Sequence, residues 1–134
     1  MSRENVEIVR RTIDFFNTGD VDKALEEASV DFEMDWSNSI GPLRGVYGGR
    51  QEVRKVWAAF IDAWETVQWE PKEIIDVDHA RVIVVNRVQM RGRGSGVDVD
   101  ATGVQLWTLA AGVAQRVKLY QSKVEALEAA GLSE

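Results

Sequence analysis

The fold is decided by residues 81–91, which read RVIVVNRVQMR, and by the two apolar stretches that follow them. Residues 81–91 are rich in Val and Ile, which predicts one long strand. The glycine-rich segment 92–96 breaks this strand, residues 97–109 form the next, and the turn at 110–112 leads into a last strand over residues 113–122. Strands joined by such short connections predict a mainly antiparallel sheet.

Two further strands are predicted before this region. Residues 32–36, Phe-Glu-Met-Asp-Trp, alternate apolar and acidic side chains, which is typical of a half-buried strand. Residues 67–77 hold Trp69, Ile74 and Ile75, and also Pro71. Because proline lacks an N–H group, Pro71 favours an edge strand or a bulge.

Helices are predicted at both ends of the chain. Apolar residues at a helical spacing predict a first helix that ends at Gly19, a second over residues 21–28 and a third over residues 50–65. The polar segment 37–49 between the first strand and the third helix is expected to be a loop, and residues 124–132 close the chain as a short helix. This order predicts an α+β fold, in which a curved, mainly antiparallel sheet forms a cone around the N-terminal helices.

Composition narrows the class of protein. The chain has 134 residues, 16 Lys and Arg, 22 Asp and Glu, and a net charge of −6, so we expect one domain over residues 1–134 and no nucleic-acid partner. It has no Cys and one His, which excludes disulfides and argues against a metal site. No apolar run approaches the ~18 residues of a membrane span, and the first residues resemble no signal peptide, so we expect a cytoplasmic protein without a membrane partner.

Six stretches of the sequence resemble the SnoaL-like proteins of the nuclear transport factor 2-like superfamily. Together they extend along essentially the whole chain. They are ENVEIVRR (residues 4–11) with FNTGD (16–20), GVYGGRQEV (45–53), RGRGSG (91–96), LWTL (106–109) and EALEAAGL (125–132).

The resemblance implies a cone-shaped sheet whose concave face and helices enclose an apolar pocket. It also implies a homodimer that forms through the sheet. Members of the superfamily include ketosteroid isomerases, polyketide cyclases, limonene epoxide hydrolases and binding proteins without catalysis, so the fold alone does not determine the function. We expect no cofactor.

The acids that some relatives use are missing from the matching positions. Where the epoxide hydrolases carry Arg-x-Asp and a second Asp, this chain has Arg87, Gln89 and Leu119, so that activity is not expected. Positions where cyclases place a His and an acid hold Gln105 and Ser122. Neutral amides orient a ligand by hydrogen bonds, but they do not act as general bases at neutral pH.

An isomerase or cyclase that acts on a carbonyl-containing hydrophobic substrate is the enzymatic hypothesis. The resemblance places the base of the isomerases near Asp35 or Trp36. Neighbours on a strand face opposite sides, so the register decides whether Asp35 is a pocket-facing base or a solvent-facing acid that alternates with Met34. In the first case Asp35 is the candidate catalytic residue, and Arg87 or Gln105 steadies the substrate oxygen.

The other hypothesis is a small-molecule-binding protein whose ligand is hydrophobic and carries a carbonyl or carboxylate. The expected ligand-binding residues are Trp36, Trp69, Arg87, Gln89, Gln105 and Trp107. In this interpretation Arg87 faces the pocket and pairs with an anion. The alternative is that Val82, Val84, Val88 and Met90 face inward and Arg87 lies in water or at a dimer interface. Trp57 and Trp64, seven residues apart on the third helix, are expected to be core residues. A third hypothesis, a dimerisation module, predicts an interior that the chain's own side chains fill.

Overall fold

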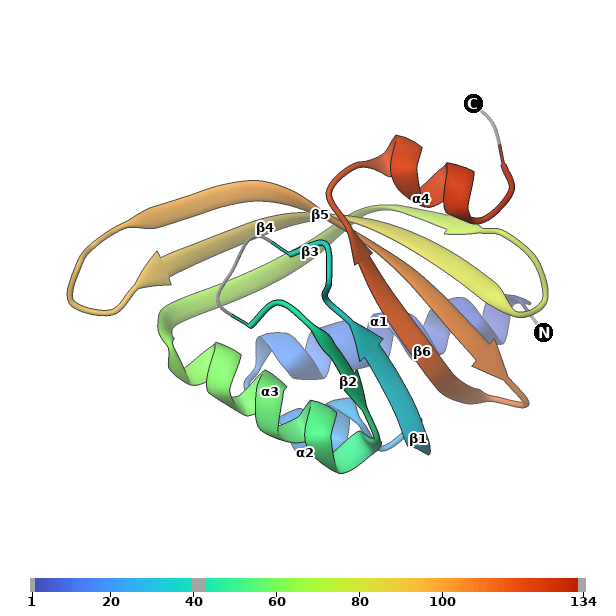
Figure 1. Ribbon diagram of the computed structural model, residues 1–134, viewed down its shortest axis with the longest axis horizontal. Helices are drawn as coiled ribbons and strands as arrows, with labels where there is room; N and C mark the ends of the chain where they lie inside the picture. Colours follow the sequence, from blue (N-terminus) through green and yellow to red (C-terminus); the bar gives the residue numbers. More distant parts are fainter. Residues whose placement is uncertain (1, 40–42, 133–134) are drawn as a thin grey trace.

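The computed structural model describes residues 2–39 and 43–132, and its centre is one curved sheet of six strands (Figure 1). The strands follow one another across the sheet in the order β2-β1-β6-β5-β4-β3. Their bounds are β1 (Ala28–Asp35), β2 (Val46–Gly48), β3 (Trp64–Asp76), β4 (Arg81–Gly92), β5 (Asp98–Ala110) and β6 (Val113–Tyr120). All neighbours are antiparallel except β1 and β6, which run parallel.

The helices lie on both sides of this sheet. Helices α1 (Ser2–Asn17), α2 (Val21–Ala24) and α3 (Arg50–Asp62) lie on the concave side, whereas α4 (Lys123–Ala129) lies on the opposite, outer face (Figure 1). The α+β expectation with a curved, mainly antiparallel sheet is therefore confirmed. Within the described part of the chain, no helix is long and apolar enough to cross a membrane.

Several boundaries differ from the sequence prediction by a few residues, and at three places the type of element changes. Helix α2 ends at Ala24, because β1 begins at Ala28 beside β6. Helix α3 ends at Asp62, and Trp64 starts β3 opposite Gly92 instead of continuing the helix. The short strand β2, which pairs with the end of β1, lies in the segment that was expected to be a loop. Tertiary pairing overrides the local apolar spacing at these places.

The position of Pro71 is confirmed in both respects. Strand β3 lies at the edge of the sheet, and its register with β4 shifts between Pro71 and Glu73. A missing N–H group is tolerated at an edge, because no further strand needs it there.

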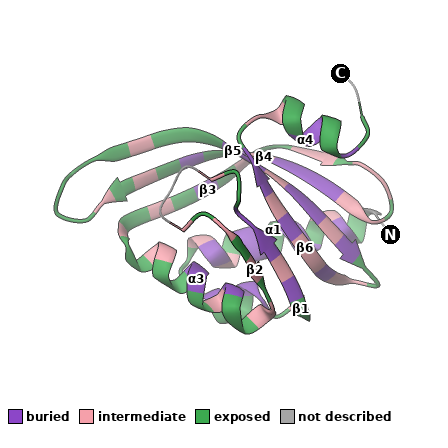
Figure 2. Ribbon diagram, in the orientation of Figure 1, coloured by how far each residue is buried: buried purple, intermediate pink, exposed green. Residues whose placement is uncertain are grey.

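The strands bury side chains on both faces (Figure 2). On the concave face, Val82, Val84 and Val88 of β4 face the helices and belong to the main hydrophobic core. On the outer face, a second cluster lies between the sheet and α4. Its buried members are Ile83, Val104, Leu106, Tyr120, Ala126, Leu127 and Ala130. The period of two along β4 therefore supplies both cores from alternate residues.

Candidate functional site

The interior of the cone contains a small cavity between α1, α3 and the concave face of the sheet. Its lining consists of Thr12, Ile13, Phe16, Trp36, Trp57, Trp69, Gln105, Trp107 and Val117. The cavity has a volume of about 20 Å³, which is room for about one water molecule. In this conformation the protein's own side chains fill most of the space that the resemblance implied to be a pocket.

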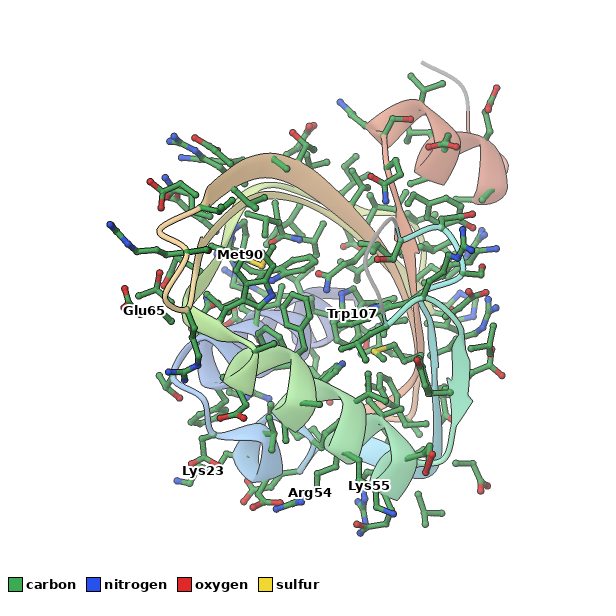
Figure 3. All side chains as sticks on the ribbon, turned by 60° about the vertical axis from the view of Figure 1, so that its left-hand side comes forward. Lys23, Arg54, Lys55, Glu65, Met90 and Trp107 are labelled. Atoms are coloured by element: carbon green, nitrogen blue, oxygen red, sulfur yellow. The ribbon has the colours of Figure 1, made fainter. Side chains whose placement is uncertain are left out.

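Aromatic rings supply most of the wall. Phe16 of α1 meets Trp57 of α3 edge to face at 5.3 Å and Trp69 of β3 at 6.3 Å between ring centroids. Phe32 stacks against Trp107 at 6.1 Å, deep between the sheet and the helices. Figure 3 shows Trp107 in this interior, whereas Lys23, Arg54 and Lys55 point away from it. Edge-to-face and offset-stacked arrangements at such separations are the ones that aromatic pairs prefer.

A small polar network interrupts this aromatic wall. The Gln105 Oε1 atom accepts hydrogen bonds from Asn86 Nδ2 at 3.1 Å and from Trp107 Nε1 at 3.3 Å. Two buried polar atoms, Trp69 Nε1 and Asn86 Oδ1, have no hydrogen-bond partner among the described residues. Native proteins leave few buried polar groups unpaired, so these two atoms call for an explanation.

Four of the predicted ligand-binding residues come together in this lining. They are Trp36, Trp69, Gln105 and Trp107, and they come from β3, β5 and the residue after β1. Trp57 lies in the core as expected and also lines the cavity. The core position expected for Trp64 is wrong: Trp64 starts β3, is half-buried and belongs neither to the two core clusters nor to the lining.

Arg87 and Gln89 do not face the cavity, which corrects the orientation expected from the sequence. Both side chains are exposed on the outer face of β4. Arg87 pairs there with Asp100 of β5, with its Nη2 atom 2.7 Å from Asp100 Oδ2. The physical reason is the strand period of two: Val88 faces the helices, so its neighbours on either side face outward.

Asp35 is buried but faces the outer side of the sheet, because its neighbours Met34 and Trp36 face the core. Its Oδ2 atom lies 3.1 Å from Arg116 Nη2 and 3.7 Å from Lys118 Nζ, and its Oδ1 atom accepts the Ser37 N–H at 2.9 Å.

These contacts set the protonation of Asp35. Burial alone would raise the pKa of Asp35, but hydrogen bonds from Ser37 and the charges of Lys118 and Arg116 outweigh it, so the pKa lies below its ordinary value. The Asp35 carboxylate is therefore a partner of cations on the outer face and does not belong to the cavity lining.

The chain carries the sequence signature of a known family over most of its length. A family model described as a SnoaL-like domain matches residues 9–117. The chain belongs to the SnoaL-like domain family. A comparison with curated protein sequences gave no match.

Solved structures of other proteins share this SnoaL-like fold. TerC, crystallised with polyporic acid, is 21% identical, with 96% of this chain and 98% of that chain covered and a TM-score of 0.78. A protein of ketosteroid isomerase-like fold from Catenulispora acidiphila, in complex with trimethylamine, is 13% identical over 95% and 94% of the two chains, at a TM-score of 0.76. A nuclear transport factor 2-like protein of unknown function from Burkholderia pseudomallei is 19% identical over 93% and 95%, also at 0.76. At these identities the similarity shows the fold alone.

The described side chains that line the cavity of this SnoaL-like domain are uncharged. None of the described lining residues carries an ionisable side chain. Nor do three or more His, Asp or Glu side chains gather in a metal-binding arrangement within residues 2–39 and 43–132. Such a wall orients and desolvates a bound molecule, but it supplies no general base at neutral pH.

Sequence reasoning missed Asn86, which is 1% exposed and completes the polar network. The sequence does contain a signal for Asn86. Alternate residues of β4 face the helices, and Asn86 is the one polar residue in the series with Val82, Val84 and Val88. A polar residue in phase with buried apolar ones indicates a specific polar contact.

Proposed function

We propose that this SnoaL-like domain binds a small, flat, largely apolar molecule in the cavity between α1, α3 and the sheet. The observation that carries the proposal is the lining itself, with four Trp side chains, one amide and no ionisable group. Binding sites for small molecules are typically apolar and aromatic with few polar groups. The presence of polyporic acid and of trimethylamine in two structures of the same fold supports small-molecule binding as the function class.

Binding requires the cavity to expand. A volume of about 20 Å³ accepts one water, whereas ligand pockets hold several hundred Å³. The ligand therefore enters by displacing aromatic side chains. Trp36 and Phe60, which meet edge to face at 5.3 Å, are suited to this movement because Phe60 is only partly buried.

The isomerase or cyclase alternative requires a base beside the substrate. Its candidate, Asp35, lies on the other face of β1 and is paired with Arg116 and Lys118. A carboxylate whose pKa is lowered by hydrogen bonds from Ser37 and by nearby cations is also a weaker base than a free one. The geometry therefore favours binding over proton transfer.

The five Trp side chains provide the test, because four line the cavity and Trp64 does not. In a ¹⁵N-labelled sample, a titration with 2-ethylnaphthalene should shift the indole N–H signals of Trp36, Trp57, Trp69 and Trp107 in a saturable way. The signal of Trp64 should stay in place and serves as the internal control. Shifts confined to Trp64, or no saturable shift at all, would contradict the proposal and favour the filled dimerisation module.

We also propose that the chain forms a homodimer through the outer face of the sheet, as the family resemblance implies. Support comes from the uncovered outer surface of β3, β4 and β5, because α4 covers only part of that face (Figure 1). The exposed pair of Arg87 and Asp100 lies on this surface. Light scattering after size exclusion should give twice the 15.0 kDa chain mass; a monomer at micromolar concentration would refute the dimer.

A further inference from the structure

We infer that Trp69 and Gln105 select ligands that carry an uncharged hydrogen-bond acceptor, such as a ketone or amide oxygen, and that the cavity rejects carboxylates. The inference rests on the proposed function and names the chemical class of its ligand. It replaces the carboxylate-binding role that the sequence suggested for Arg87.

Two hydrogen-bond donors of the lining have no partner among the residues that the structure describes. The Trp69 Nε1–H group is fully buried and unpaired, on a residue that is only 7% exposed. The Gln105 Oε1 atom already accepts from Asn86 and Trp107, and its Nε2 group donates to no residue that the structure describes. Gln105 is half-buried, so the buried N–H group of Trp69 is the donor that costs free energy without a partner, and a ligand acceptor recovers that cost on binding.

Gly103 brings the side chains of Trp69 and Gln105 onto one wall. A Cβ atom on Gly103 would lie 3.0 Å from Cζ3 and 3.2 Å from Cη2 of Trp69, so the indole ring of Trp69 lies across β5 at this residue. Gln105 follows Gly103 by two residues on the same strand, and therefore on the same face. The indole of Trp69 and the amide of Gln105 are consequently neighbours on the cavity wall.

None of the described residues that line this wall is a cation. Arg87 faces outward and is paired with Asp100, and Arg116 and Lys118 are paired with Asp35 on the outer face of the sheet. The other unpaired atom near Gln105 is the carbonyl oxygen of the Asn86 side chain, which repels an anion. A carboxylate would thus lose its water without gaining an opposite charge, which is strongly unfavourable.

Three probes of the same ring size test the inference: 2-acetylnaphthalene, 2-ethylnaphthalene and 2-naphthoate. We expect the neutral ketone to bind about three- to tenfold more tightly than the hydrocarbon, as one or two uncharged hydrogen bonds allow. The carboxylate should bind more weakly than both. In the unaltered protein, the ketone should also move the Trp69 indole N–H signal downfield further than 2-ethylnaphthalene does.

Two variants test which side chains donate the hydrogen bonds to the ketone oxygen. Trp69→Phe and Gln105→Leu should each reduce the preference for ketone over hydrocarbon, while both still bind 2-ethylnaphthalene. Arg87→Gln is the matched control and should leave all three affinities unchanged. Equal or tighter binding of 2-naphthoate, or a ketone preference that survives both variants, would overturn the inference. Failure of all three probes to bind would instead refute the proposed function. The N–H shift needs no variant, so unfolding of Trp69→Phe would not remove the test.

Discussion

The side chain of Asn17, the last residue of α1, exchanges two hydrogen bonds with the backbone of Trp69. Asn17 Nδ2 donates to the Trp69 carbonyl oxygen at 2.8 Å, and the Trp69 N–H donates to Asn17 Oδ1 at 2.8 Å. Strand β3 is an edge strand, so the amide of Asn17 takes the place that a further strand would occupy. This contact ties the cavity residue Trp69 to the end of α1.

Replacing Asn17 by Ala should lower the free energy of unfolding by about 1–2 kcal/mol, because two partly buried hydrogen bonds are lost. The near-ultraviolet circular dichroism of the Trp residues should also weaken, since the backbone of Trp69 becomes less fixed. Urea unfolding measures the first effect. Thr18→Ala is the control, because its exposed hydroxyl bonds only to the Phe15 carbonyl of the same helix end; a loss as large as that of Asn17→Ala would contradict this explanation.

Gly103 is expected to be intolerant of even one methyl group. A Cβ atom there would lie 3.0 Å from both Trp69 Cζ3 and Val88 Cγ2, inside ordinary contact distance. Gly103→Ala should therefore shift the Trp69 ring and cost about 1–3 kcal/mol, the usual penalty of overpacking a core. Gly48→Ala is the matched control, because a Cβ atom on Gly48 meets nothing within 4 Å. Similar stability and tryptophan fluorescence for the two variants would refute the steric argument.

The sheet could be predicted because its signals are local. The Val-rich run of β4, the glycine-rich turn after it and the placement of Pro71 each specify strand or edge directly. The end of α3 could not be predicted, because Trp64 continues the apolar spacing of the helix. Only its pairing with Gly92 across the sheet makes it a strand residue.

The site was predictable only in part. Trp36, Trp69, Gln105 and Trp107 line the interior cavity, as the polar N–H of Trp and the shared strand face of Gln105 and Trp107 suggested, while their role in binding a ligand stays a prediction. Arg87 was placed on the wrong face because its orientation was inferred from the family resemblance. The period of two of the valines beside it indicates the buried face more directly. The small volume of the cavity depends on how the rings of Phe16 and its neighbours pack, and no pattern in the sequence encodes that packing.

Asp35 should contribute to stability in a pH-dependent way. Its pKa is lowered in the folded state, so the contribution is complete above the unfolded value of about 4 and is lost as the pH falls through the folded pKa. Asp35→Asn should therefore cost about 1–3 kcal/mol at pH 7, because the charge-assisted hydrogen bond from Arg116 is weakened and the ion pair with Lys118 is lost. The difference between the two proteins should shrink as the pH falls below about 4.

The control for Asp35 is Asp22→Asn. Asp22 of α2 also pairs with an arginine, Arg54 of α3, and has a lowered pKa, but this pair is exposed and lies away from the outer face of the sheet. We expect no measurable loss of stability at neutral pH from Asp22→Asn. Denaturant unfolding of the three proteins from pH 3 to 7 measures both effects. A pH-independent loss in Asp35→Asn would show that its role is packing and not charge.

Asn86 should be more important for binding than for stability. Its Oδ1 atom is buried without a partner, so replacement by Val removes an unfavourable group and extends the inward valine row of β4. The Gly103 carbonyl loses one donor at 3.3 Å, a long and weak bond, and Gln105 keeps the Trp107 N–H. We therefore expect Asn86→Val to unfold at the same or a higher urea concentration than the unaltered protein. Its affinity for 2-acetylnaphthalene should fall, because Gln105 is then held by one partner instead of two. A variant that is clearly less stable, with its ketone affinity intact, would show that Asn86 serves the fold and not the ligand.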